Sequence, residues 1–257
     1  MTGHIFNDIG AWTIASLVAV AMVAGWIVGR SIGQRLRLRS EGKAAVSKFL
    51  DASLAVLGLL LAFTFSTALV KHDQRRLMVV ADSNAIGDFY TCASLLKEPV
   101  RTRLRQVIHD YAALRLDLSK RTYDANAIEI ALGQFQQMHS QMVTLVSQAL
   151  ADGTPIAVSL TNTLNAVTSR QAERLAAVRD RLPTIIVVLL LLSAVISAML
   201  VGREQGVADE HDLAGTISFI VLVSCIIFVT LDLNQPDRGF ISVDQEPIQR
   251  LLSTMSE

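Results

Sequence analysis

The sequence predicts an all-α membrane protein, with four transmembrane helices and a helical extramembrane bundle between the second and the third. Three observations predict this fold class. The 257 residues have a mean hydropathy of +0.43 and only 18% charged residues, which is unusual for a soluble domain. Four apolar stretches are each long enough to cross a bilayer. The long segment between the second and third stretches has the periodicity of amphipathic helices.

The four apolar stretches carry no charge before their last turns, which favours insertion of each as a helix. The leader of the first, MTGHIFNDIG, has no Lys or Arg, so a cleaved signal peptide is not expected. Three spans are the alternative if the fourth stretch is only partly inserted. The expected spans are residues 11–29, 52–70, 182–202 and 214–233.

These spans divide the chain into four predicted regions. A first transmembrane hairpin covers residues 1–70, and a second covers residues 182–233. An extramembrane helical domain covers residues 71–181, and a C-terminal tail that includes a short amphipathic helix covers residues 234–257.

Basic residues predict the orientation. The loop at residues 30–48 carries six Lys/Arg and one Glu, and short basic loops stay in the cytoplasm. This places the N-terminus and the helical domain of the multi-pass protein outside the cytoplasm. Both ends of the helical domain are also basic, so the opposite orientation stays open.

Residues 71–181 read as four amphipathic helices, of which the first and last continue the neighbouring spans. Pro99 stands where the first turn of a helix tolerates proline, and Gly153 fits a helix stop. Apolar residues recur three and four positions apart along each helix. These stripes predict the core of a bundle, with packing between subunits as the alternative.

The end of the second span, LLLAFTFSTALVKHDQRR, becomes polar on one face. Leu60, Thr64, Thr67 and Lys71 share this face because they follow helical spacing. In a purely structural reading the hydroxyls bond back to their own helix or contact a neighbouring one. In a functional reading this face lines an ion pathway on the axis of a homo-oligomer, since one chain has too few spans to enclose it. The candidate pore-lining residues are Leu57, Leu60 and Phe63 as an apolar constriction, then Thr64, Thr67 and Lys71.

The sequence gives little support for catalysis, cofactor binding, nucleic-acid binding or a metal site. The serines lack a GxSxG elbow and no nucleophile–base pair is recognisable, so we expect neither catalytic residues nor enzyme activity. Phosphate-binding glycine motifs are absent and the formal net charge is zero, so no cofactor and no nucleic acid is expected. Cys92 and Cys225 have no zinc spacing, and residues 209–212 favour a solvated acidic hairpin over a metal site. Asp232 is read as interfacial, with Arg238 as an alternative partner.

Four stretches resemble a bacterial membrane-protein family of unknown function that is described as bestrophin-like. They are LLLAFTFSTALVKHDQRR, VVADSNAIGDFY, LLKEPVRTRLRQVIHDY and LDLNQPDRGFISVDQEPI, and the resemblance covers about residues 50 to 250. Its most specific residues are Arg75, Arg76, Asn84, Gly87, Asp232, Pro236, Arg238 and Gly239.

True bestrophins are pentameric channels whose second span lines the pore. The resemblance therefore implies a pentamer with its constriction at Leu57, Leu60 and Phe63. The acidic run that binds calcium in animal bestrophins has no counterpart here, so calcium gating is not expected. In bestrophins the termini and the large domain are cytoplasmic, and the basic loop argues for the opposite orientation here. The resemblance to a bacterial family implies the bacterial inner membrane, so the N-terminus and the helical domain are expected in the periplasm.

The favoured function is thus an ion channel whose partners are the lipid bilayer, further copies of the chain and inorganic ions. The sign of ion selectivity stays open because Lys71 and Asp73 do not face each other on a helix. The main alternative is a non-conducting sensor or scaffold whose helical domain binds a ligand or a partner protein. A transporter is less favoured because no intramembrane charge or broken helix is visible.

Overall fold

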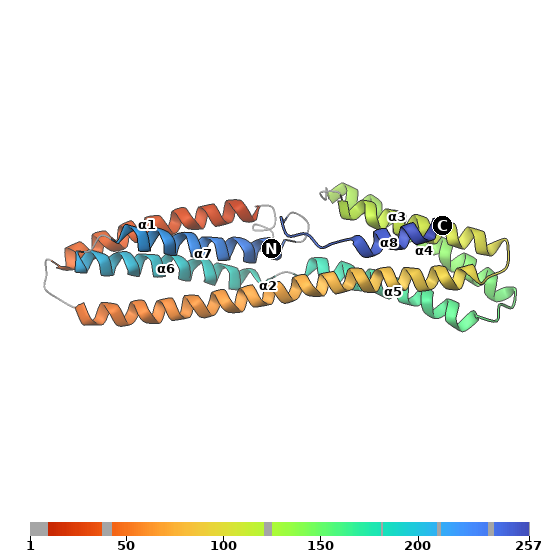
Figure 1. The fold of residues 1–257 in the computed structure, drawn as a ribbon, viewed down its shortest axis with the longest axis horizontal. Helices are drawn as coiled ribbons and strands as arrows, with labels where there is room; N and C mark the ends of the chain where they lie inside the picture. The colour runs from red at the N-terminus through yellow and green to blue at the C-terminus, as the bar shows by residue number, and fades with distance from the viewer. Residues whose placement is uncertain are drawn as a thin grey trace. The chain divides into compact units, whose positions relative to one another are not determined.

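The computed structural model describes residues 10–37, 43–120, 125–180, 182–209, 212–235 and 239–256, and all regular structure in them is helical (Figure 1). The elements are α1 (Ala11–Arg37), α2 (Lys43–Ser94), α3 (Val100–Lys120), α4 (Ala125–Ala151), α5 (Ala157–Arg179), α6 (Thr184–Ala208), α7 (Leu213–Leu233) and α8 (Glu246–Met255). The predicted all-helical class is confirmed at this level.

Four helices are long and apolar enough to cross a membrane: α1, α6, α7 and residues Lys48–Ser94 of α2. They correspond to the four expected spans, and α7 is among them, so the alternative of three spans is not favoured. Helices α1 and α6 run past the apolar stretches to Arg37 and Ala208, since helix-favouring residues follow.

The chain folds into two compact units. The first unit comprises Met1–His72 and Arg181–Ile241, and the second comprises Asp73–Asp180 and Ser242–Glu257. Helix α2 contributes to both without a break, as the absence of Gly and Pro between residues 59 and 76 predicts.

Glycines bring α1 and α6 into direct backbone contact in the first unit. A Cβ atom added to Gly202 would lie 2.1 Å from the Trp26 carbonyl oxygen, and one added to Gly29 would lie 1.9 Å from that of Met199. Gly206 meets Gly33 in the same way one turn further on. Small residues at this spacing let two membrane helices approach closely, so α1 and α6 form a tightly packed pair.

The second unit has its own apolar core. Its largest fully buried side chains include Phe89 of α2, Tyr111 of α3, Met142 of α4 and Leu160 of α5. The amphipathic stripes therefore do supply a core, with small shifts: on α4, Val146 is buried while its neighbour Leu145 is only partly so.

Two local features of the second unit follow from sequence. Gly153 adopts a left-handed φ of 72° after α4, where the Thr154 N–H donates to the Ala149 carbonyl at 3.2 Å, so it ends the helix as expected. The C-terminal α8 docks through Ile248, which is 0% exposed, and Met255. The segment 242–257 thus belongs to the second unit.

Candidate functional site

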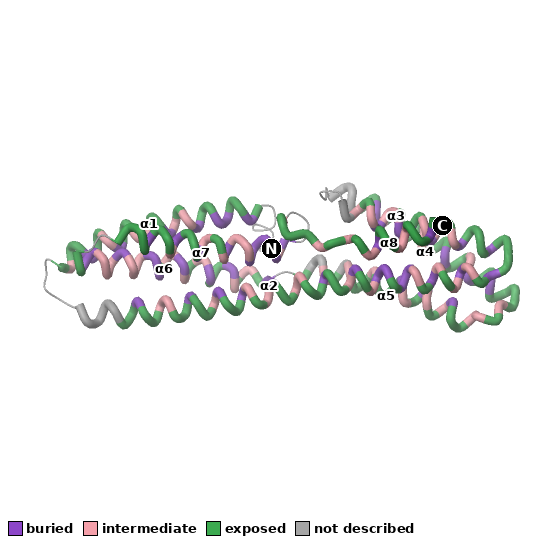
Figure 2. Tube along the Cα trace, viewed as in Figure 1, coloured by how far each residue is buried: buried purple, intermediate pink, exposed green. Residues whose placement is uncertain are grey.

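Helix α2 buries one face along its length and exposes the opposite one (Figure 2). In the first unit the buried residues are Leu50, Leu57, Leu61, Thr64 and Ala68, which follow helical spacing. In the second unit the same face continues with Arg75, Val79, Asp82, Ile86, Phe89 and Ala93. Each unit therefore packs one face of its part of α2 into its own core.

The six predicted pore-lining residues do not share one level of burial. Leu57 and Thr64 are 2% and 1% exposed and pack inside their own chain, whereas Phe63 is 59% exposed. Leu60, Thr67 and Lys71 are half-buried, between the two faces. Burial in a single chain says which residues are available to a neighbouring copy, so Phe63 is the most available of the six.

The hydroxyls of this stretch are satisfied within their own helix. Thr64 Oγ1 donates to the Leu60 carbonyl at 2.7 Å, and Thr67 Oγ1 donates to the Phe63 carbonyl at 2.8 Å. This is the back-bonding that makes threonine tolerable in a membrane helix. Neither hydroxyl depends on a ligand for its hydrogen bond.

Arg75 links α2 to the end of α5. Its side chain is buried; Nε donates to the Ala177 carbonyl at 3.3 Å and Nη2 donates to the Asp180 carbonyl at 3.0 Å. The last carbonyls of a helix lack helical partners and carry partial negative charge, so a guanidinium stabilises them. Arg76, the second arginine of the motif, is exposed.

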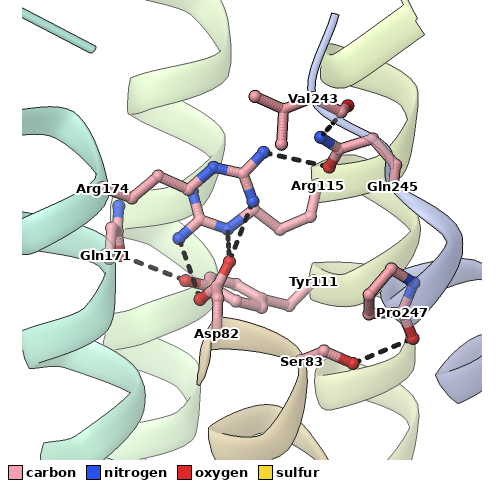
Figure 3. A network of polar contacts seen from close by, with 9 residues as sticks. All are labelled: Asp82, Ser83, Tyr111, Arg115, Gln171, Arg174, Val243, Gln245 and Pro247. Atoms are coloured by element: carbon pink, nitrogen blue, oxygen red, sulfur yellow. Dashed lines mark hydrogen bonds and ion pairs between the residues drawn. The ribbon is translucent and has the colours of Figure 1, made fainter. Parts of the chain in front are cut away.

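Two turns further along, Asp82 is the centre of a buried ionic network (Figure 3). Asp82 is 0% exposed and lies between two arginines. Arg115 Nη2 donates to Oδ1 at 3.3 Å while its Nε lies 3.1 Å from Oδ2, and Arg174 Nη1 donates to Oδ2 at 3.0 Å. One carboxylate thus holds two guanidinium groups from α3 and α5.

The surroundings of the network orient both arginines. Arg115 lies over the Phe135 ring at 5.0 Å and over the Tyr111 ring at 5.5 Å from the centroid. Arg174 Nη2 donates to Gln245 Oε1 at 3.3 Å, which brings in the segment before α8. Burial raises the pKa of Tyr111 to about 12, so its phenol stays neutral and donates to Gln171 at 3.3 Å.

Sequence reasoning missed this network, although a signal was present. Asp82 falls on the apolar stripe of Val79 and Ile86, and Arg115 falls on the stripe between Tyr111 and Leu118. A charge at a core position of an amphipathic helix requires a partner. The pattern indicated a buried ion pair, but it did not say which helices would supply the opposite charges.

Two further residues of the family resemblance, Asn84 and Gly87, lie close to Asp82 on α2. Asn84 is exposed, whereas Gly87 makes room for α8, because an added Cβ would lie 3.2 Å from Leu251 Cδ1. Ser83 Oγ donates to the Pro247 carbonyl at 2.9 Å beside it. These contacts join α8 to the turn of α2 that carries Asp82.

Asp232 has a structural task at the end of α7. It is 2% exposed, and its carboxylate accepts the backbone N–H groups of Phe240 and Ile241 at 2.9 Å each. Gly239 is needed because an added Cβ would lie 2.8 Å from the Asp232 carbonyl oxygen. Asp232 thus anchors the loop that follows α7. Its place at the membrane boundary stays a prediction, and its alternative partner Arg238 lies outside the described residues, as does Pro236.

No group of three or more His, Cys, Asp or Glu suited to a metal occurs among the residues that the structure describes. Of the acidic hairpin, Asp209 pairs with Arg37, and the Asp212 carboxylate accepts the Gly215 N–H at 2.8 Å as an N-cap of α7. Glu210 and His211 lie outside the described residues.

Comparison with known proteins assigns the family. The model of a protein family described as Bestrophin-like domain matches residues 15–248, which is most of the chain. No curated protein and no solved structure matches the chain. The match includes α2 with Arg75, the Asp82 network and the Asp232 anchor. The chain therefore belongs to the bestrophin-like domain family, and its four apolar helices make it a membrane protein of that family.

Proposed function

We propose that the protein is an ion channel formed by several copies of the chain, with α2 of each copy nearest the shared axis. The observation that carries this proposal is the exposed face of α2. In the first unit this face presents Leu59, Phe63 and Val70, which are 71%, 59% and 51% exposed, together with Ser66. An aqueous path needs several copies because one chain supplies too few helices to enclose it.

The face has the composition of a gated path. With 100° between successive residues of a helix, Leu59, Phe63, Ser66 and Val70 fall within one narrow arc. Rings of Leu59 and Phe63 would close a path by dewetting, and Ser66 would solvate an ion beyond them. Leu57 and Thr64 would then hold α2 against its own chain, and Leu60, Thr67 and Lys71 would lie at the contacts between copies.

The continuation of the face favours cations. Between Asp73 and Ser94 the centre of this face carries Asn84 and two carboxylates, Asp73 and Asp88, all exposed, while the exposed Arg76 lies at its margin. Rings of carboxylates concentrate cations at a pore entrance. Lys48 stands at the opposite end of the face. We infer a preference for cations that depends on Asp88.

We infer the membrane location and the orientation of the channel from the sequence. The resemblance to a bacterial family supports the bacterial inner membrane, and the basic residues between 30 and 48 support an orientation with the N-terminus and an extramembrane second unit in the periplasm. A reporter fused after Glu257 checks this, and a cytoplasmic signal would reverse the orientation. We further infer that the protein is not an enzyme, since no nucleophile–base pair is recognisable.

Ion flux through liposomes tests the channel. Purified protein is reconstituted, and flux is followed under K⁺ and Cl⁻ gradients with empty liposomes as a blank. Leu59→Ala is compared with Leu222→Ala on α7, a leucine that is 61% exposed. We expect only Leu59→Ala to raise the flux, because it widens the constriction. Absence of flux at several pH values would overturn the channel.

A sensor is the second candidate. The second unit has its own core and a pocket of about 330 Å³, which is the organisation of a ligand-binding domain. Co-purification of a stoichiometric partner protein, together with absent flux, would favour this function.

A further inference from the structure

A pocket of about 330 Å³ lies in the second unit beside α3, the end of α2 and the end of α8. Its polar lining comprises Tyr90, Thr102, Arg105, Gln106, His109 and Ser256. The pocket is separate from the exposed face of α2, because Tyr90 is partly buried and lies on the side that meets α3 and α8.

The guanidinium of Arg105 is held in a fixed position at this pocket. Its central carbon lies 4.8 Å from the Tyr90 ring centroid, and Nη2 donates to the Tyr90 hydroxyl. That hydroxyl donates in turn to the Met255 carbonyl at 3.0 Å. A guanidinium stacked on a ring and tethered at one nitrogen is preorganised for binding.

The other donors of Arg105 are not all used. Its Nε is shielded from solvent and has no hydrogen-bond partner within the described residues. A buried donor without a partner is costly, so the site is not fully satisfied by the protein alone. The guanidinium also stays charged at any physiological pH, so an anion at its remaining N–H groups would supply the missing countercharge.

Neighbouring carboxylates do not supply that countercharge. Glu98 accepts Arg101 Nε at 2.7 Å and the Thr102 hydroxyl at 2.9 Å, while Asp110 accepts Gln106 Nε2 at 2.9 Å. Within the described part of the chain, Arg105 has no ion-pair partner.

We propose that this pocket binds a small oxyanion, a phosphate or carboxylate group, on the guanidinium of Arg105. Two oxygens of such a group match the fork of a guanidinium, and charge-assisted hydrogen bonds of this kind are short and strong. The hydroxyl of Ser256 and the ring of His109 stand at the same pocket and complete a polar lining. The anion would thereby join α2, α3 and α8 within the second unit.

Calorimetric titration of the full-length protein with sodium phosphate tests the site. The protein is held in nanodiscs of neutral lipid, and sodium chloride of equal ionic strength is the blank. We expect saturable binding by the wild type. Arg105→Gln should weaken it roughly tenfold or more, because charge-assisted hydrogen bonds are lost. Arg105→Lys should fall between, since it keeps the charge without the fork.

Arg103→Gln is the matched control, because Arg103 is an exposed arginine on the same helix that does not line this pocket. It should bind phosphate as the wild type does. A second arm uses nanodiscs with phosphatidylglycerol: loss of phosphate binding there would identify a lipid headgroup as the source of the oxyanion. Absence of saturable phosphate binding to the wild type in neutral lipid, or equal binding by Arg105→Gln, would overturn the proposal.

Discussion

Replacing Asp82 with asparagine tests the ionic network at its centre. The substitution keeps the shape of the side chain but removes the one carboxylate that Arg115 and Arg174 share. Both arginines are largely shielded, with side chains 6% and 17% exposed, so solvent screens their charges poorly. Leaving charges buried without their partner costs about 3–5 kcal/mol in comparable networks.

This loss should be visible as a local change. For a unit of this size, 3–5 kcal/mol corresponds to a decrease in Tm of roughly 10–20 °C. Hydrogen–deuterium exchange in detergent should accelerate in α3 and α5, which carry the two arginines. The α1–α6 pair in the first unit should keep its protection, because its glycine contacts do not involve Asp82.

Two further variants decide whether the cause is the buried charge. Asp88→Asn makes the same chemical change at an exposed position of α2 and should leave exchange unchanged. Combining Asp82→Leu with Arg115→Met removes one charge of each sign and should recover part of the stability. If Asp82→Asn exchanges like Asp88→Asn, the network contributes little and the reasoning is wrong.

Three other outcomes are expected. Arg75→Met should speed exchange at the end of α5 by the equivalent of about 1.5–3 kcal/mol, because two charged hydrogen bonds to its carbonyls are lost, whereas Arg76→Met should not. Because the pKa of Tyr111 is raised from 10 to about 12, its contribution to stability is complete below pH 10 and is lost as the pH rises to 12. The free energy of unfolding of the wild type should therefore decrease between these pH values, and denaturation of Tyr111→Phe should lack that part of the decrease. Gly202→Leu should abolish folding, because the new side chain would meet the backbone of α1. Gly58→Ala should be tolerated, since an added Cβ there meets nothing within 4 Å. Size-exclusion chromatography in detergent measures both. A monodisperse Gly202→Leu protein would contradict the close α1–α6 contact.

Much of the fold follows from the sequence because it depends on local composition. A run of about 20 apolar residues has few alternatives to a membrane helix, and a stretch without Gly or Pro, such as residues 59–76, gives a helix no reason to end. This is why the four apolar helices, and the continuation of α2 beyond its apolar part, were predictable. The Gly153 stop was equally local, since few other residues adopt its left-handed backbone.

The rest depends on partners distant in sequence. The spacing of Leu60, Thr64 and Thr67 correctly places them near one face, but spacing does not say whether that face meets the same chain or another. Thr64 turned out to be buried because threonine is inexpensive in a membrane helix once it bonds back to a carbonyl. Asp232 likewise anchors a loop whose backbone lies eight and nine residues later.

The continuity of α2 also constrains how this chain can change length during evolution. Inserting or deleting one residue within α2 would turn everything beyond it by about 100°, so that within the second unit Val79 and Ile86 could no longer both face the core. Changes of seven residues nearly restore the phase, as do changes of eleven. Family members should therefore differ in length within this helix by such steps, while the connection between α4 and α5 accepts single residues.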